Sequence, residues 1–234
     1  MKKFWKEVRV EQVAGGVGGW QVALDGRGIR TQGRRPQIVP TAALAALLAG
    51  EWQAQGETID AAAFPHRDMA DYAIDRIATG ADDIPAKLIA FMETDTLCYR
   101  ADPDEPLFKR QLDVWEPIVG AFEAREGIRV ERASGIIHKA QPTETLGTLR
   151  ERIDTLDPFT TAALFAVTSL SASLTIGLAA LQADADTEAL WDAACLEEDW
   201  QIELWGEDPE AADRRARRKR DFLRAVAFAR AAAD

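Results

Sequence analysis

The feature that most constrains the fold is an uncharged run that extends from Phe159 to Leu181. A run of this length could cross a membrane as a helix. Its seven Ser and Thr residues are many for a spanning helix, and acids rather than basic residues flank it, at Asp157 and Asp184. We therefore expect a central helix of a soluble bundle, in which small residues such as Gly177 allow neighbouring helices to approach closely.

A second unusual segment, Leu196 to Asp208, contains two Trp and six carboxylates. Read together with the residues before it, it has apolar side chains on two opposite faces, which predicts a helix buried between neighbours. Glu198 lies within one apolar stripe, so its carboxylate needs a partner or a cleft. It is either part of a structural ion pair with an Arg or part of a recognition site. Gly206 is predicted to end the helix.

Charge and cysteine content narrow the class of protein. The formal net charge of -11 argues against a general nucleic-acid binder, which must neutralise phosphates. Two cysteines, Cys98 and Cys195, give no disulfide framework and suit a reducing compartment. The N-terminal residues Met1 to Glu7 carry charges where a signal peptide has an apolar run, so we expect a cytoplasmic protein.

The N-terminal part of the chain has the period-two alternation of β-strands. Residues alternate from Phe4 to Glu11 and again from Trp20 to Leu24, with the glycine-rich stretch Gly15 to Gly19 between them. The dipeptide Asp25-Gly26 predicts a hairpin turn. Gln37 to Val39 is predicted to add a short edge, which makes this part antiparallel β-structure.

The rest of the chain is predicted to be helical. We expect one helix to begin at the cap Thr41 and a small hairpin to lie between Ile128 and Ile137. Other helices are expected near 67–79 and 84–93, from a cap at Thr143 to 156, and at about 209–233. A further helix is predicted to start at Asp104 and Pro106, to be kinked or interrupted at Pro117, and to end at Gly127. The fold class is therefore α+β. We predict a β-rich domain with one helix at residues 1–65 and a larger all-helical domain at residues 66–234.

Motifs for catalysis and cofactor binding do not appear. No Gly-Lys-Ser/Thr closes the glycine-rich stretch, and Gln21 stands where a dinucleotide motif that starts at Gly16 requires glycine. His66 and His138 are remote from each other in sequence and lie in no metal-binding motif. We therefore expect no catalytic residues, no cofactor and no metal. A hydrolase that uses the acids between Glu198 and Asp208 stays an open alternative.

The basic run from Arg214 to Arg220 allows two interpretations. It could be a solvated helix face that balances the preceding acids, or an arm that binds nucleic acid. Seven Trp residues, several of them beside carboxylates, favour a protein-binding role, because Trp is enriched in binding hot spots. From the residues alone, a binding module is therefore favoured over an enzyme.

Several strings with specific order and spacing extend this interpretation. They are Leu24-Asp25-Gly26-Arg27, Val39-Pro40-Thr41, Glu51-Trp52-Gln53-Ala54-Gln55, Thr94-Asp95-Thr96-Leu97-Cys98-Tyr99-Arg100, Arg110-Gln111, Trp115-Glu116-Pro117, Glu198-Asp199-Trp200-Gln201 and Trp205-Gly206-Glu207-Asp208. Together they resemble the family of assembly chaperones dedicated to the α subunit of the F1 sector of ATP synthase. The family pattern Trp-Asp-Pro appears here as Trp115-Glu116-Pro117.

The resemblance implies a β-rich N-terminal domain, a larger helical domain, and binding of newly made F1 α subunit before it meets β. It implies no catalysis and no cofactor, and the absence of a transit peptide indicates a bacterial member. We expect a monomer that binds neither nucleic acid nor membrane. The resemblance places a functional acid between Glu198 and Glu207. The candidate client-binding residues are Glu198, Asp199, Glu203, Trp205, Glu207, Asp208, Trp52 and Arg100.

Overall fold

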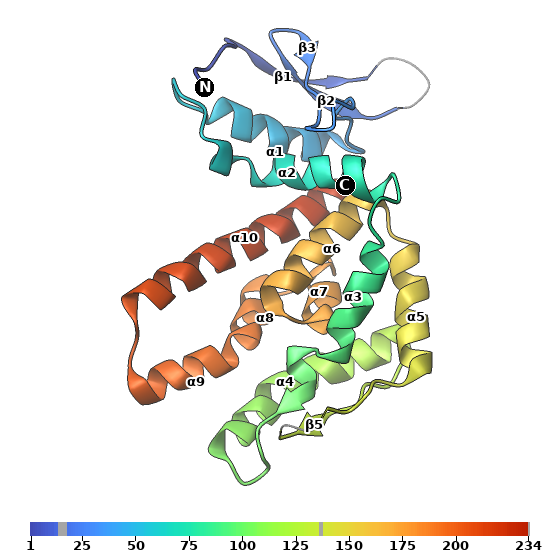
Figure 1. Cartoon of the computed structure of the whole chain (residues 1–234), viewed down its shortest axis with the longest axis vertical. Coiled ribbons are helices and arrows are strands. Elements are labelled where there is room, and N and C mark those ends of the chain that lie inside the picture. The colour runs from blue at the N-terminus through green and yellow to red at the C-terminus, as the bar shows by residue number, and fades with distance from the viewer. Residues whose placement is uncertain (14–17, 136–137, 234) are drawn as a thin grey trace. The chain divides into compact units, whose positions relative to one another are not determined.

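The computed structural model describes residues 1–13, 18–135 and 138–233 (Figure 1). A three-stranded antiparallel sheet is followed by a mostly helical region, and the described residues contain ten α-helices, so the α+β prediction is confirmed. The chain forms two compact units. The first comprises Met1–Asp83, Asp157–Ala163 and Arg224–Asp234, and the second comprises Ile84–Leu156 and Leu164–Leu223. The predicted domain division after residue 65 stays a prediction.

The sheet has the strand order β1 (Val8–Gln12), β2 (Trp20–Leu24) and β3 (Arg27–Gly28). Asp25 and Gly26 adopt positive φ angles of 49° and 76° and form the predicted turn between β2 and β3. The Asp25 carboxylate accepts hydrogen bonds from the backbone N–H groups of Glu7 and Lys6, which hold its pKa below the usual value. The predicted edge is reduced to an isolated bridge between Val39 and Trp20. Of the glycine-rich connection, residues 14–17 lie outside the described residues.

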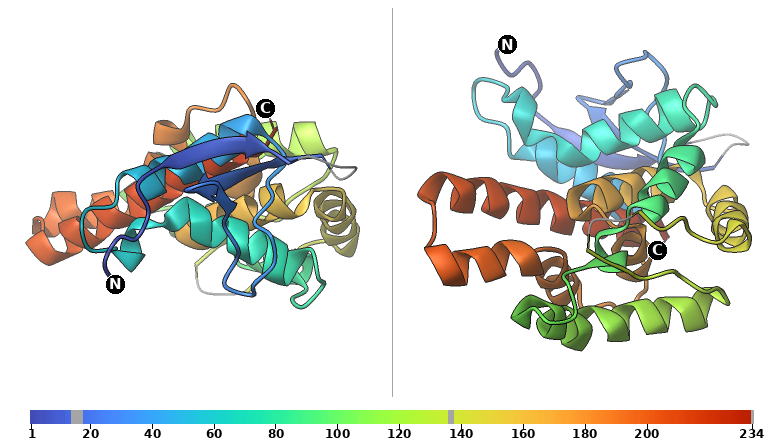
Figure 2. Two further views of the ribbon diagram at one scale, coloured as in Figure 1. Left: turned by 90° about the horizontal axis from the view of Figure 1, so that it is seen from above. Right: turned by 60° about the horizontal axis from the view of Figure 1, so that its bottom comes forward.

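Helices α1 (Ala42–Gln53) and α2 (Pro65–Tyr72) belong to the first unit, and α1 packs against β1 and β2 (Figure 2). Thr41 caps α1 as predicted, because its side chain accepts a hydrogen bond from the N–H of Leu44. A π-helical turn, Ala73–Ile77, continues α2. The buried core of this unit includes Trp5, Val22, Leu44, Leu48 and Phe64.

The described residues of the second unit form six complete helices, which are α3 (Ile84–Glu93), α4 (Pro106–Glu126), α5 (Thr143–Asp154), α7 (Leu174–Ala180), α8 (Thr187–Ala194) and α9 (Leu196–Trp205). Two further helices contribute to both units, α6 (Pro158–Ser171) and α10 (Pro209–Ala233). The prediction that Pro117 could interrupt this helix is wrong, because α4 continues through it. Gly127, with φ 68°, ends that helix as predicted.

The prediction of one central helix from Phe159 to Leu181 is wrong, because the run forms two helices. Ala172 adopts a φ of 51° between α6 and α7, and Ser173 then caps α7 by accepting a hydrogen bond from the N–H of Ile176. The predicted close approach is confirmed at Gly177, where an added Cβ would lie 2.2 Å from the hydroxyl oxygen of Thr168 in α6. Among the described residues, no helix is long and apolar enough to cross a membrane.

The predicted hairpin between Ile128 and Ile137 is also wrong in its described part. Strand β5 (Ala133–Ser134) pairs in parallel with β4 (Tyr99–Arg100), and residues 136–137 lie outside the described residues. The segment before β5 is held against α4, because the Glu123 side chain of that helix accepts a hydrogen bond from the N–H of Val130. Thr143 is the first residue of α5 rather than its cap, since Pro142 occupies the cap position.

A buried carboxylate joins α2 to the loop after β3. Asp71 is almost fully buried, and its two oxygens accept hydrogen bonds from the side-chain amide of Gln37, at 2.5 Å, and from the backbone N–H of Gln32, at 3.0 Å. Burial raises the pKa of Asp71 although these hydrogen bonds oppose the shift. The amide oxygen of Gln37 is buried without a hydrogen-bond partner among the described residues.

Asp71→Asn is therefore expected to raise the free energy of unfolding at pH 7 by about 1 kcal/mol. A raised folded pKa means that ionisation of Asp71 lowers stability as pH rises above its unfolded value near 3.8. Asn cannot ionise, and it can donate to the amide oxygen of Gln37 once that amide rotates. Urea unfolding at pH 7 and pH 3 tests this, and the difference should disappear at pH 3. Asp71→Ala, the control that loses both acceptors, should be destabilised, and an Asn variant weaker than wild type at pH 7 would contradict the argument.

Candidate functional site

The acid-rich helix α9 is more exposed than the sequence predicted. The expectation of a helix buried between neighbours is wrong, because within α9 only Leu196 is buried, while Leu204 is 56% and Trp205 78% exposed. The two-faced pattern assumed that α8 and α9 form one helix. The backbone breaks at Cys195, with φ -96° and ψ 6°, so the buried stripe of α8 does not continue along α9.

Three acids of α9 form ion pairs within the second unit. Glu198 contacts Arg218 at 2.8 Å, Asp199 contacts Arg215, and Glu203 contacts Arg110 at 2.6 Å. Two of these arginines belong to α10 and one to α4. Helix α9 thus runs beside the first half of α10 (Figures 1 and 2). Glu198 therefore forms the ion pair that the sequence allowed. Whether it also contacts a client stays a prediction.

Basic side chains of the run 214–220 in α10 mainly form ion pairs with acids of α8 and α9. Besides Arg215 and Arg218, Lys219 contacts Glu188 and lies 3.7 Å from Asp192 in α8. This arrangement favours the interpretation of residues 214–220 as a helix face that balances neighbouring acids.

Glu197 differs from the other acids at the start of α9. Its carboxylate accepts a hydrogen bond of 2.7 Å from the side-chain amide of Gln111, and the ion pairs found among the described residues do not include it. Glu197 is exposed toward solvent, yet the protein around it removes part of its hydration and raises its pKa, while the Gln111 hydrogen bond opposes that shift.

Glu197 lies at the junction of two neighbouring grooves of the second unit. The larger, about 610 Å³, is lined by Tyr99, Arg100, Ala101, Asp102, Glu105, Leu107, Gly135, Glu197, Trp200, Gln201, Leu204 and Trp205. The smaller, about 450 Å³, is lined by Thr94, Thr96, Tyr99, His138 and Glu197. Tyr99 and Glu197 line both, and the Tyr99 hydroxyl lies 2.7 Å from Nδ1 of His138.

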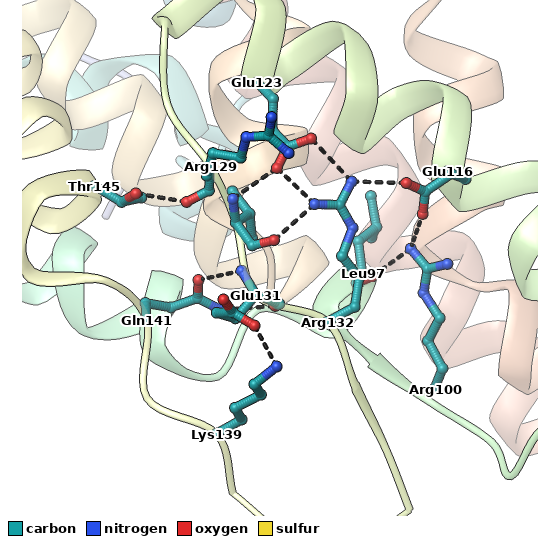
Figure 3. Close-up of polar contacts among 11 residues, drawn as sticks. Leu97, Arg100, Glu116, Glu123, Arg129, Glu131, Arg132, Lys139, Gln141 and Thr145 are labelled. Carbon is teal, nitrogen blue, oxygen red and sulfur yellow. Dashed lines mark hydrogen bonds and ion pairs between the residues drawn. The ribbon is translucent and has the colours of Figure 1, made fainter.

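Arg100 lines the larger groove but is held from behind by an ion-pair network (Figure 3). Its side chain is 2% exposed and contacts Glu116 at 2.8 Å. Arg132 contacts the same Glu116 at 2.7 Å and Glu123 at 2.6 Å. Burial alone would raise the pKa values of Glu116 and Glu123, but hydrogen bonds and charge from the arginines outweigh it and lower both. Arg100 therefore supports the groove wall.

The remaining candidates fall in different places. Trp205 and Asp208 line a cavity of about 270 Å³ together with Glu198, and Asp208 accepts a hydrogen bond from the N–H of Glu210 at the start of α10. Glu207 is exposed beside them. Trp52 belongs to the first unit, where its ring lies 5.0 Å from that of Trp5 and 4.7 Å from that of Phe64.

The structure also identifies groove residues that the candidate set omitted, namely Tyr99, Trp200 and Glu197. Glu197 and Trp200 share one side of α9, three residues apart, and that spacing was a signal available in the sequence. Tyr99 lies in β4, which pairs with β5 of a segment more than thirty residues away, so local sequence signals did not reveal its place in the groove.

The cysteines and the potential metal-binding side chains give little support for catalysis. Cys98 and Cys195 are free and buried, and burial raises the pKa of Cys195 to about 11, so this thiol is largely protonated at neutral pH. In the described part of the chain, no group of three or more His, Cys, Asp and Glu side chains is arranged to hold a metal ion.

Comparison with known proteins gives a consistent result. Residues 2–123 match the family model described as ATP12 chaperone protein. The crystal structure of Atp12 from Paracoccus denitrificans is similar over 99% of this chain and 98% of that one, with 34% identity and a TM-score of 0.91. A mutant of the same P. denitrificans protein gives 34% identity, a TM-score of 0.91 and coverage of 99% and 97%. The Atu1473 protein of Agrobacterium tumefaciens is 36% identical with a TM-score of 0.90, over 97% of this chain and 84% of that one.

Proposed function

The chain belongs to the ATP12 chaperone family, whose members assist assembly of ATP synthase without catalysing a reaction, and from this premise we propose how it acts. We propose that it binds the unassembled F1 α subunit and shields the surface that the β subunit later covers. The observation that carries this proposal is the exposure of Leu204 and Trp205 on the acid-rich helix α9.

Exposed large apolar side chains on a charged helix suit reversible binding. Trp is enriched among residues that dominate interface energies, and a surrounding polar rim excludes water from such anchors. An isolated α subunit would itself expose an apolar interface and would tend to aggregate. Trp205 and Leu204 can cover such a surface, while the carboxylates of α9 favour basic groups on the client and disfavour acidic ones.

The proposed complex is one-to-one and transient. In this proposal the free chaperone is a monomer in the bacterial cytoplasm, binds no nucleic acid, and leaves when β arrives because two partners cannot occupy one surface. A reversible complex suits an interface of roughly 1,600 Å² or less.

Trp205→Ala is expected to weaken binding of purified F1 α subunit at least tenfold, a loss on the order of 2 kcal/mol. Its thermal unfolding midpoint should match that of wild type, because the side chain is 78% exposed and contributes little to the core. Isothermal titration calorimetry and circular dichroism measure the two quantities. Phe4→Ala, which removes a 66% exposed aromatic side chain in the first unit, is the matched control. Equal affinity of Trp205→Ala and wild type would reject α9 as the binding surface.

Displacement by β is tested separately. Excess β subunit added to the chaperone–α complex should release free chaperone on size-exclusion chromatography. A stable species that contains all three proteins would contradict shielding of the β-facing surface.

A further inference from the structure

One face of α4 carries apolar side chains that are open to solvent. Val114, Pro117 and Ala121 are exposed, and Ile118 is half-buried. Their positions are i, i+3, i+4 and i+7, so they lie in one row along the helix, and we call this row the α4 stripe. A helix usually turns such a row of apolar residues toward a neighbour. The α4 stripe therefore has the pattern of a contact surface.

The α4 stripe forms one wall of a groove of about 590 Å³ in the second unit. The other wall comes from α7, α8 and the loop that joins them, and its apolar residues are Ala179, Ala185, Ala189 and Leu190. Of all the residues that line the groove, only Leu190 is buried. The groove is therefore open, unlike a small-molecule site, which encloses most of its ligand. An open apolar surface of this kind suits a protein partner.

The charged side chains around the groove are mainly acidic. Asp113, Asp184 and Asp186 line it together with one cation, Arg125. Arg125 already contacts Glu126 at 2.8 Å, whereas the ion pairs found among the described residues include neither Asp113 nor Asp184. The rim of the groove therefore presents net negative charge to a partner, and it favours one that carries lysine or arginine.

Pro117 adds a backbone acceptor to this rim. Proline has no N–H, so the carbonyl of Asp113, four residues earlier in α4, lacks its usual helical donor. Lysine and arginine side chains carry donors and no acceptors. Asp113 thus offers such a side chain both a carboxylate and a carbonyl oxygen.

We propose that this groove binds an amphipathic helix of the F1 α subunit, with the apolar face of that helix on the α4 stripe and its basic side chains against Asp113 and Asp184. Helices that dock in grooves use apolar anchors at i, i+3, i+4 and i+7, and the α4 stripe has the same spacing, so the two rows can interdigitate. A second copy of this chain suits the groove less well, because two chains of formal net charge -11 repel each other. The proposal rests on the proposed function for the identity of the client, but the groove can be tested without the client.

The first experiment blocks the groove with a long side chain. Ala121→Arg places that side chain on the α4 stripe, and its affinity for purified F1 α subunit, measured by isothermal titration calorimetry, should fall about tenfold. Ala124→Arg is the matched control, because Ala124 is exposed in the same helix but does not line the groove. Both variants add the same charge to an exposed helical position, so both should keep the wild-type thermal unfolding midpoint. Equal affinities of the two folded variants would overturn the groove as a contact with α while leaving the proposed function intact.

The second experiment uses a helical peptide in place of the α subunit. The peptide carries leucines at i, i+3, i+4 and i+7 with lysines beside them, and it is titrated into the ¹⁵N-labelled full chain while the backbone N–H signal of Ala189 is followed. We expect a saturable shift that is absent in Ala121→Arg and retained in Ala124→Arg. A peptide with glutamate in place of each lysine should bind at least tenfold more weakly. Equal affinity for the two peptides, no binding of either, or a shift that persists in Ala121→Arg would overturn the proposal.

Two further outcomes separate the groove from its occupant. If wild type fails to bind α but binds the lysine peptide as expected, the proposed client is rejected and the groove remains a site for basic helices. Sedimentation equilibrium of the free protein tests the other occupant. A dimer of wild type that Ala121→Arg abolishes would assign the groove to a second copy of this chain and would overturn the proposal.

Discussion

Replacing Asp95 by Ala is expected to lower the free energy of unfolding by about 3 to 5 kcal/mol. Asp95 is fully buried, and its two oxygens accept hydrogen bonds from the N–H of Leu97, at 3.0 Å, and from the N–H of Thr175, at 2.9 Å. One carboxylate thereby caps the 3-10 turn Thr96–Cys98 and the first turn of α7. Ala would leave both buried N–H groups without an acceptor and would open a small cavity.

Urea unfolding of wild type and Asp95→Ala at pH 7 measures this loss. Asp95→Asn should fall between them, since its amide keeps one acceptor oxygen and places a donor against the second N–H group. Asp184→Ala, which removes an exposed carboxylate from the same unit, should change stability by less than about 0.5 kcal/mol. If the Asp95 and Asp184 variants behaved alike, the two buried hydrogen bonds that Asp95 accepts would not contribute the expected stability.

Arg132→Met is expected to lower the free energy of unfolding by about 2 to 3 kcal/mol at pH 7. It would remove the partner that Glu123 and Glu116 share, leaving the first without its ion pair and the second with Arg100 alone. The estimate lies below that for a fully buried pair, because Arg132 is 24% and Glu116 46% exposed.

The effect of Arg132→Met should depend on pH in a defined direction. Both glutamates have folded pKa values below their usual 4.5, so the stability that they contribute is present above pH 4.5 and is lost as pH falls through the lowered values. The difference between wild type and variant should therefore be full at pH 7 and much smaller near pH 3. Arg150→Met, which removes an exposed i,i+4 contact with Asp154, is the control and should cost a few tenths of a kcal/mol. A difference that stays the same at both pH values would mean that Arg132 acts through packing and not through charge.

Local signals in the sequence were sufficient to predict several elements of the fold. The Asp25-Gly26 turn, the cap at Thr41 and the helix Ile84–Glu93 all appear where predicted. In each case neighbouring residues determine the conformation through turn geometry, a capping hydroxyl or helical spacing.

The break between α6 and α7 and the pairing of the α9 acids could not be predicted from the sequence, because both depend on contacts between distant residues. The break between α6 and α7 is stabilised by Asp95, which is 80 positions away from Thr175. Likewise, whether an acid of α9 is paired depends on Arg110 in α4 and on arginines of α10. Glu197 and Glu198 are adjacent and chemically identical, so composition and spacing could not show that only Glu198 forms an ion pair within the described residues.

The pairing of α9 with α10 also changes what a neutralising substitution does to the protein surface. Removing the charge of Glu198 or Asp199 would leave Arg218 or Arg215 uncompensated, so that patch would become cationic and repel a basic client. A glutamine or alanine scan would then record weaker binding at positions that the client never touches. Glu197→Gln would leave no arginine uncompensated, because the partner of Glu197 is the neutral side chain of Gln111. Among these three neighbours, a loss of client binding at Glu197 can therefore be assigned to a direct contact.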